Sequence, residues 1–340
     1  MVALVVTIKD IARKAGVAPS TVSRVIQDHK GISTATKEKI RLIMDEMDYR
    51  PNVSARNLVL NSSHTIAMIL KSEAHDAYEN PFNNAVYNGV VEACREDGYS
   101  IISTTKNTER EILEEVKSLI RLRQVDGFIV MFSKTGNKVT EYLSSVGSPF
   151  VVVGKDINQN SDAIYIDNDN VTAAYQLTQL MIDKGIRDIR VINDDEGFTV
   201  AKDRMKGFKD ALRDNALDSD ECIIQVGSEL ESIRDTLKEA ITKKQPEGII
   251  TFDGYLHAKV LAALYELNIR VPDDMLTATF NESPLTQFAS PPQTTVDIHT
   301  ADIGREAGRA LIGLIQEPNK LKCNITLPTQ VIERQSTRKE

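Results

Sequence analysis

Residues 7–27 read TIKDIARKAGVAPSTVSRVIQ, a pattern typical of two short helices joined by a tight turn. Thr7 followed by Asp10 is a capping-box-like start, and the apolar residues after Thr7 recur at helical spacing. Gly16 ends the first helix, because glycine accepts the left-handed conformation just beyond a helix end. Pro19 suits the first turn of the second helix, where a proline loses no helical hydrogen bond. The sequence therefore predicts a helical hairpin.

The second predicted helix has an apolar face and, opposite to it, a polar face. The polar face carries Pro19, Ser20, Ser23, Arg24 and Gln27. Arginine can donate two hydrogen bonds to guanine, glutamine can do so to adenine, and serine can bond either base. This is the chemistry of a helix that lies in the DNA major groove, although an ordinary solvated helix face has a similar composition.

The hairpin is followed by two further predicted helices. Residues 33–48 have the apolar spacing of a third amphipathic helix, and Pro51 ends it because the residue before a proline is pushed out of the helical region. Residues 52–59 predict a short fourth helix that Asn52 can cap. Leu58 is apolar but belongs to no apolar stripe, which leaves two interpretations open: a staple that packs onto the body, or a wedge that enters a minor-groove base step and bends the duplex.

These motifs closely resemble the lac-repressor family of bacterial transcription regulators, and the resemblance extends through nearly the whole chain. The matching residues are Val6-Thr7-Ile8-Lys9-Asp10-Ile11-Ala12, Gly16-Val17, Thr21-Val22-Ser23-Arg24-Val25, Tyr49-Arg50-Pro51-Asn52, Ala55-Arg56 and Leu58. The resemblance implies a helix-turn-helix DNA-binding domain over 6–51 and a hinge helix and linker over 52–64. The residues expected to bind DNA are Thr7, Pro19, Ser20, Thr21, Ser23, Arg24, Asn52, Ala55, Arg56 and Leu58.

Length and composition narrow the class of protein. The chain has 340 residues, which favours two or three domains. It contains no run of eighteen apolar residues, and its apolar start is too short for a signal peptide, so a cytoplasmic protein without a membrane partner is expected. The three cysteines and five histidines show neither a disulfide pattern nor metal-ligand spacing. We therefore expect no metal and no cofactor.

Charge is unevenly distributed along the chain. Residues 1–60 hold ten basic and six acidic side chains, a net charge of +4, although the whole chain has a net charge of −8. The remaining residues therefore carry −12. A basic N-terminal head and an acidic body are typical of a protein that binds the phosphates of nucleic acid through one end only.

From residue 65 onward, predicted strands and helices alternate, which indicates parallel sheets with helices on both faces. The predicted fold class is α/β, with an N-terminal helix-turn-helix head plus two doubly wound parallel-sheet subdomains. By resemblance, the body over 65–336 is similar to a periplasmic sugar-binding protein and crosses three times between its subdomains. The expected N-subdomain spans about 65–166 and 296–322, and the C-subdomain about 167–295 and 323–336. The last strand is expected over 326–333, and a helix over 85–97.

Ligands of doubly wound sheets bind beyond the carboxyl ends of the strands. The polar and aromatic residues expected there are Asn80, Phe82, Ser133, Lys155, Asp156, Asp194, Asp253 and Asn281, and the family pattern adds Arg204. Because the chain has no tryptophan, stacking on a sugar ring would fall to Phe82, Phe132, Phe198, Phe252 and Tyr255. The residues expected to bind the effector are Phe82, Lys155, Arg204, Asp253 and Asn281, although a lone aspartate at a strand end is as often a helix cap.

Several body motifs resemble the maltose-operon repressors of low-GC Gram-positive bacteria. They are Val152-Val153-Gly154-Lys155, Asp167-Asn168-Asp169-Asn170, Ser283-Pro284-Leu285, and Pro291-Pro292 with Thr295-Val296-Asp297-Ile298. The resemblance implies a homodimeric repressor of a maltose or maltodextrin operon, bound to an inverted repeat in double-stranded DNA and released by a small sugar. The resemblance places the dimer surface on the body, including the helices near 83–97 and 255–267.

Other functions remain open at this point. The same frame serves carbon-catabolite regulators that use a phosphorylated carrier protein as corepressor, and regulators that respond to purines or other sugars. An enzyme is disfavoured because the sequence has no glycine-rich phosphate loop, no His-Glu-x-x-His motif and no nucleophile elbow. A secreted binding protein is disfavoured by the basic head and the lack of a signal peptide.

Overall fold

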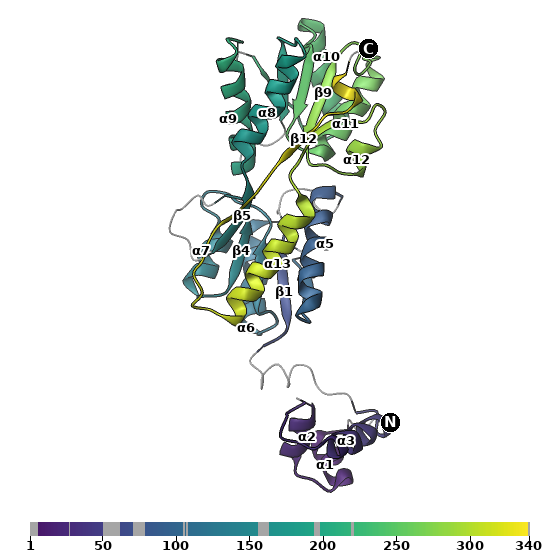
Figure 1. Cartoon of the computed structure of the whole chain (residues 1–340), viewed down its shortest axis with the longest axis vertical. Helices are drawn as coiled ribbons and strands as arrows, with labels where there is room; N and C mark the ends of the chain where they lie inside the picture. The colour runs from purple at the N-terminus through teal and green to yellow at the C-terminus, as the bar shows by residue number, and fades with distance from the viewer. Residues whose placement is uncertain are drawn as a thin grey trace. The chain divides into compact units, whose positions relative to one another are not determined.

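The computed structural model describes residues 6–26, 28–49, 62–70, 79–104, 106, 108–155, 163–193, 198–218 and 221–338 (Figure 1). The chain forms two compact units, Met1–Ser63 and His64–Glu340, which we call the head and the body. No helix within the described ranges is long and apolar enough to cross a membrane. Some of the residues singled out above lie outside these ranges: Gln27, Asn52, Ala55, Arg56, Leu58, Asp156 and Asp194.

The head consists of three helices around a small apolar core. They are α1 (Ile8–Ala15), α2 (Pro19–Ile26) and α3 (Thr34–Glu46). The carboxylate of Asp10 accepts hydrogen bonds from the Thr7 amide and hydroxyl at 3.0 and 2.6 Å, which confirms the predicted start of α1. Gly16 has φ of 71°, so the turn uses the left-handed conformation that favours glycine. Ile11, Val22 and Ile40 are fully buried and join the three helices.

The first sheet of the body has six parallel strands in the order β11-β5-β4-β3-β1-β2. The strands are β1 (Thr65–Ile69), β2 (Ser100–Ser103), β3 (Gly127–Val130), β4 (Phe150–Val153), β5 (Ile164–Asn168) and β11 (Ile325–Leu327). One face packs on α5 (Pro81–Glu96) and α13 (Thr300–Gln316). The other face packs on α6 (Glu109–Arg121) and α7 (Lys138–Ser145).

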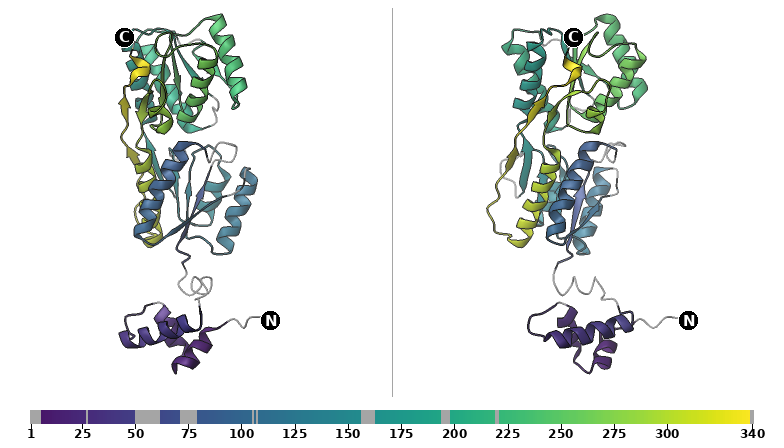
Figure 2. Two further views of the ribbon diagram at one scale, coloured as in Figure 1. Left: turned by 90° about the vertical axis from the view of Figure 1, so that its right-hand side faces the viewer. Right: turned by 45° about the vertical axis from the view of Figure 1, so that its right-hand side comes forward.

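The second sheet has the order β12-β10-β9-β8-β6-β7. Its strands are β6 (Ile189–Asn193), β7 (Ile223–Gln225), β8 (Gly248–Thr251), β9 (Leu276–Phe280), β10 (Thr294–Asp297) and β12 (Gln330–Ile332). One face packs on α8 (Asn170–Asp183) and α9 (Thr199–Asp214), and the other on α10 (Leu230–Lys243) and α11 (Gly254–Glu266) (Figure 2). Short helices α12 (Pro284–Gln287) and η1 (Gln335–Thr337) complete this subdomain. The predicted α/β class with two doubly wound sheets is confirmed.

The end of the chain differs from expectation. The single strand expected over 326–333 is wrong, because β11 pairs with β5 in the first sheet and β12 pairs antiparallel with β10 in the second. Pro328 lies between them and has no N–H for a ladder bond, so the strand is interrupted there. Consequently β11 belongs to the first subdomain, not the second, and β10 carries the second subdomain's sheet as far as Asp297.

Helices α5 and α13 approach each other closely in the first subdomain (Figure 1). A Cβ on Gly89 would lie 2.0 Å from the Ala301 carbonyl oxygen, and one on Gly304 would lie 2.1 Å from that of Val86. Glycine at both positions therefore lets the two backbones touch. Helix α5 begins four residues earlier than the expected 85, because Asn80 caps it and Pro81 occupies its first turn.

Candidate functional site

The polar face of α2 is present in the head. Pro19, Ser20 and Arg24 are exposed, and Thr21 and Ser23 are half-buried, while Val22 and Val25 fill the core. Thr7 is exposed at the start of α1. The face therefore offers hydroxyl groups and a guanidinium outward from a helix that is fixed by its apolar side.

The basic groups of the head differ in their availability. Arg13 pairs with Asp10, Lys14 with Glu46, and both Lys37 and Arg41 pair with Asp28. Arg24 forms no ion pair with any residue that the structure describes. It is the basic residue in the last turn of α2, and its guanidinium is not held by any carboxylate in the described part of the head.

A cavity of about 280 Å³ lies between the two subdomains of the body, at the carboxyl ends of both sheets. We call it the cleft. The five residues expected to bind an effector all line it: Phe82, Lys155, Arg204, Asp253 and Asn281. Asn80, Ser133, Phe132, Phe198, Phe252 and Tyr255 also line it. The structure thus brings together residues that are distant in sequence because parallel strands of each sheet end at the same edge.

Arg204 is the buried cation of the cleft, with 5% of its surface exposed. Its Nε donates to Asn170 Oδ1 at 2.9 Å, and Nη1 donates to the carbonyl oxygen of Phe252. The guanidinium carbon lies 4.0 Å from the centre of the Phe280 ring. Burial lowers the pKa of Arg204 to about 10, while the charges of Asp253 and Asp167 favour the protonated form. The guanidinium is therefore charged at neutral pH and held rigidly.

Asp253 has two tasks. Its Oδ1 accepts hydrogen bonds from the amides of Tyr255 and Leu256 at 2.9 and 3.1 Å and so caps α11. Its Oδ2 lies 3.2 Å from the amide nitrogens of both Asn80 and Asn281. The cap interpretation and the cleft interpretation of this aspartate are thus both satisfied, one by each oxygen.

Asn281 is the described residue of the cleft whose hydrogen bonding is incomplete. It follows β9 with φ of 70°, is 92% buried, and its Oδ1 has no hydrogen-bond partner among the described residues. A buried acceptor without a donor is costly unless a ligand or water supplies one. Because Asn281 lines the cleft, a hydroxyl group bound there could donate to it.

Contacts across the cleft join the two subdomains. Asn80 reaches Asp253, the Tyr255 hydroxyl donates to Glu79 Oε2 at 2.6 Å, and Lys155 Nζ lies 2.8 Å from Asp203 Oδ2. Lys155 therefore lines the cleft with its ammonium already paired to the opposite wall. These contacts show the body in a closed arrangement.

The aromatic residues of the cleft come from both walls. Phe132 and Phe198 face each other edge to face, with ring centres 6.3 Å apart. Phe252 is buried edge to face against Phe280 at 6.0 Å, so its ring serves packing more than ligand stacking. Phe82 is half-buried at the start of α5. The cavity thus combines apolar ring surface with charged and amide groups.

Several polar cleft residues escaped the sequence interpretation, among them Asp167, Asn168, Asn170 and Asn193. These four lie at or just beyond strand ends, so the rule used for the other residues would have found them; residues 167–170 were used only as a family resemblance and to place the subdomain boundary. Burial raises the pKa of the Asp167 carboxyl to about 6, although bonds from Asn168 and Asn170 and the charge of Arg204 oppose the shift. Its proton therefore changes the charge beside Arg204 under mildly acidic conditions.

The comparisons with known proteins agree with this geometry. Residues 7–52 match the family model for bacterial regulatory proteins of the lacI family, and residues 178–337 match a periplasmic binding protein-like domain. The HTH-type transcriptional regulator MalR of Staphylococcus xylosus is 41% identical over 333 residues, which cover 98% of each chain.

Solved structures give the same result. A probable maltose operon transcriptional repressor, malR, from Staphylococcus aureus is 34% identical, has a TM-score of 0.77, and is matched over 82% of this chain and 100% of its own. The lac repressor dimer bound to operator has a TM-score of 0.84 at 19% identity, covering 98% of this chain and 99% of its own, which shows the shared fold. The head with its exposed α2 face, the two-sheet body with its cleft and the identity over nearly the full length leave one assignment: this chain belongs to the lacI family of bacterial regulatory proteins.

Proposed function

We propose that this protein is a sequence-specific DNA-binding repressor of a maltose or maltodextrin utilisation operon, and that a small sugar bound in the cleft releases it from its operator. The observation that carries the proposal is the buried polar set of the cleft. Arg204, the Oδ2 of Asp253 that faces Asn80 and Asn281, and the unpartnered Oδ1 of Asn281 offer donors and acceptors beside aromatic rings, as a sugar requires. The 34% identical staphylococcal protein described as a maltose operon repressor supports the sugar class.

The sugar is tested by a thermal-shift panel combined with operator binding. The panel contains maltose, maltotriose, cellobiose, ribose and a purine. We expect maltose or maltotriose to raise the unfolding temperature of the full chain and to weaken its binding to an inverted-repeat operator, because a ligand shifts an equilibrium by its differential affinity for the two states. A purine or ribose that does both, with no response to maltose or maltotriose, would refute the maltose assignment and leave the regulator assignment intact.

We expect Arg24→Ala to weaken binding to the specific operator by about 1–3 kcal/mol, because a bidentate contact to guanine is lost. Binding to random DNA should fall much less. Arg41→Ala is the matched control, because Arg41 is also an exposed arginine of the head but is paired with Asp28. Fluorescence anisotropy with both DNAs measures the two affinities; equal losses on specific and random DNA would mean that Arg24 contacts only phosphate.

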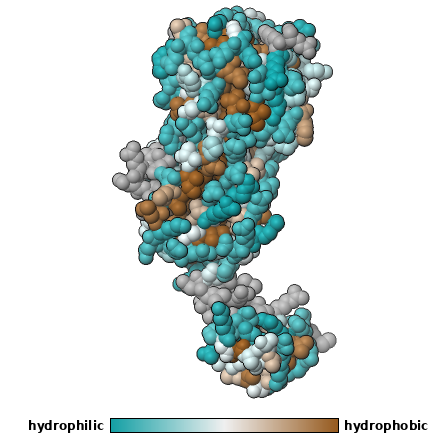
Figure 3. Space-filling model, viewed as in Figure 1, coloured by the Kyte–Doolittle hydropathy of each residue, from teal (hydrophilic) through white to brown (hydrophobic). Residues whose placement is uncertain are grey.

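We expect the protein to be a homodimer, because an inverted repeat requires a two-fold protein. The second subdomain has large apolar side chains available for a partner copy: Tyr265 of α11 is 83% exposed, and Phe288 after α12 is 82% exposed. Figure 3 shows one face of the body, on which apolar residues form patches among hydrophilic ones. Light scattering at micromolar concentration should give twice the chain mass of 37.8 kDa. A stable monomer would contradict this prediction.

A further inference from the structure

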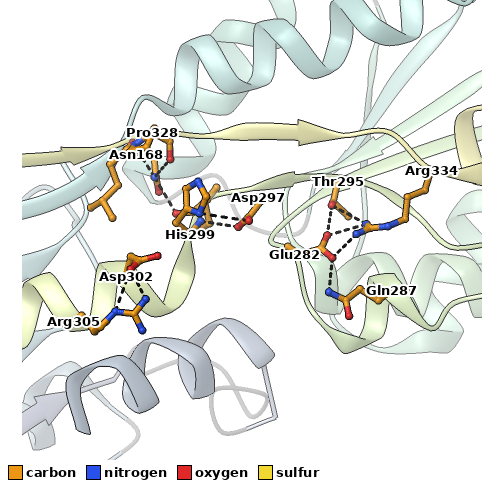
Figure 4. Close-up of polar contacts among 12 residues, drawn as sticks. Asn168, Glu282, Gln287, Thr295, Asp297, His299, Asp302, Arg305, Pro328 and Arg334 are labelled. Carbon is orange, nitrogen blue, oxygen red and sulfur yellow. Dashed lines mark hydrogen bonds and ion pairs between the residues drawn. The ribbon is translucent and has the colours of Figure 1, made fainter. Parts of the chain in front are cut away.

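The body chain passes between its two sheets at three places, which we call the crossovers. The first is 168–170, from β5 to α8; the second is 297–300, from β10 to α13; and the third is 327–330, from β11 to β12. Figure 4 shows the side chain of Asn168, the last residue of β5, pointing to the other two crossovers. Any change in the angle between the subdomains must pass through these segments, because they are the chain connections between the two sheets.

One side-chain amide ties the three crossovers together. Asn168 Nδ2 lies 3.1 Å from the carbonyl oxygen of Ile298, 3.2 Å from that of Leu327 and 3.4 Å from that of Pro328. Asn168 is only 7% exposed, so water does not easily replace it. Buried carbonyl groups require a hydrogen-bond donor, and here the Nδ2 group of Asn168 is a donor to carbonyl groups of both the second and the third crossover.

The second crossover presents its carbonyl in a fixed direction. His299 has φ of 53°, a left-handed conformation that is uncommon for a non-glycine residue. Its amide donates to Asp297 Oδ1 at 2.8 Å, and its ring Nδ1 lies 3.5 Å from Asp297 Oδ2. These contacts hold the backbone on both sides of Ile298 and therefore the carbonyl that Asn168 contacts.

The far end of the third crossover is anchored in the second subdomain (Figure 4). Arg334, just after β12, forms two bonds to the Glu282 carboxylate, at 2.6 and 2.9 Å. Gln287 donates to Glu282 as well, at 2.7 Å, and Glu282 directly follows Asn281 of the cleft. Movement of the third crossover is thus passed to the wall that carries Asn281.

Asn168 is also linked to the cleft, through the neighbouring residue Asn170. Asn170 Nδ2 donates to the Asn168 carbonyl oxygen at 3.3 Å and to Asp167 Oδ1 at 2.9 Å, while Asn170 Oδ1 accepts from Arg204. Asn168, Asn170 and Ile298 themselves line the cleft. A ligand that contacts Arg204 is therefore one residue away from the first crossover, because Arg204 is hydrogen-bonded to Asn170.

We propose that Asn168 is a positioning residue that pins the three crossovers together, so that occupancy of the cleft changes the angle between the subdomains as one concerted motion. This inference rests on the proposed function only for the identity of the sugar. Without the pin, the crossovers move independently, the cleft opens more often, and ligand binding no longer sets the subdomain angle. The pinned arrangement is the closed one, in which Asn80 reaches Asp253.

The pin is tested by hydrogen–deuterium exchange of the full chain. We expect Asn168→Ala to accelerate amide exchange about tenfold in both 296–300 and 326–330, although neither segment is mutated. Asn168→Asp should do so more strongly, because it places an oxygen against three carbonyl oxygens. Asn168→Ser keeps one hydrogen-bond donor on a shorter side chain and should show a smaller increase in exchange in the same two segments. This variant replaces the other two in the experiment if they fail to fold.

Asn137→Ala is the matched control. Asn137 is also a buried asparagine of the first subdomain, 4% exposed, but it caps α7 by accepting from Val139 and Thr140. Its loss should accelerate exchange at the start of α7 and leave the crossovers unchanged. If the two alanine variants raise exchange alike throughout the body, or if Asn168→Ala affects only 168–170, Asn168 is not a pin.

Operator binding gives the second readout. The ratio of operator dissociation constants with and without the active sugar measures the coupling between the two sites, and because Asn168 lines the cleft the sugar is used at a saturating concentration for each variant. We expect this ratio to approach one in Asn168→Ala and to stay at the wild-type value in Asn137→Ala; an unchanged ratio in Asn168→Ala overturns the proposal. If no sugar affects the wild type, the proposed effector fails, whereas the exchange experiment still decides on the pin.

Discussion

Asp253→Asn is expected to weaken binding of the sugar about 10- to 100-fold, with operator binding in the absence of sugar unchanged. Asparagine still accepts the amide bonds of Tyr255 and Leu256, so the cap of α11 is kept. The negative charge is lost, and an NH2 group replaces the oxygen that faces Asn80 and Asn281. Hydrogen bonds to charged groups contribute about 1.5–3 kcal/mol, which corresponds to this change in affinity.

Asp169→Asn is the matched control for this prediction. Asp169 also caps a helix of the second subdomain, because its Oδ1 accepts from the Thr172 amide at 3.0 Å, but it does not line the cleft. Isothermal titration with the active sugar should find Asp169→Asn close to the wild type. If both variants bind the sugar equally well, Asp253 serves only as a cap and the effector assignment is wrong.

His257 is expected to lower the stability of the protein in mild acid. It is 1% exposed on α11, where Nδ1 lies 2.9 Å from Thr251 Oγ1 and Nε2 lies 2.8 Å from Gln293 Oε1. Burial lowers the pKa of His257 from 6.5 to about 4. Between these values the unfolded chain binds a proton that the folded chain does not, so the free energy of unfolding falls as the pH decreases from 6.5 to 4. The full effect is about 3 kcal/mol.

Asp167 produces the opposite trend in an overlapping range. Its pKa is raised to about 6, so the folded chain binds a proton before the unfolded chain does, and stability increases as the pH falls from 6 to 3.8. The histidine effect is therefore measured as a difference between the wild type and His257→Gln. Urea unfolding should show this difference falling by about 2 kcal/mol from pH 7 to pH 5.

The variants Asp167→Asn and His257→Gln should change the pH dependence of stability in opposite directions. Asp167→Asn removes the gain in acid, and His257→Gln removes the loss. A wild-type minus His257→Gln difference that does not vary with pH would mean that the imidazole protonates in the folded chain as it does in water.

The head and the class of the body follow from local sequence. Thr7, Gly16 and Pro19 place the helix ends by backbone chemistry that needs no tertiary contact, and the spacing of apolar residues places the faces. Parallel strands end at one edge of a sheet, so residues after strands, such as Asp253 and Asn281, could be assigned to the cleft from the sequence.

Which cleft side chains form ion pairs, which pack in the core and which are left for a ligand depended on the tertiary structure. The sequence could not show that Lys155 pairs with Asp203, or that the Phe252 ring packs edge to face on Phe280, because these partners are brought together only by the folded subdomains. The pKa of Asp167 likewise depends on burial among residues that are distant in sequence.

The positions of the crossovers could not be predicted from the sequence and are determined by the tertiary structure. The sequence shows strand-helix units of the same kind in both subdomains, so no change of composition indicates that β11 joins one sheet and β12 the other. Sheet membership is decided by which backbone groups find partners, and that is a property of segments far apart in the chain. For the same reason Asn168 looks like an ordinary polar residue at the end of a strand, and only the folded chain places three carbonyl oxygens around its amide.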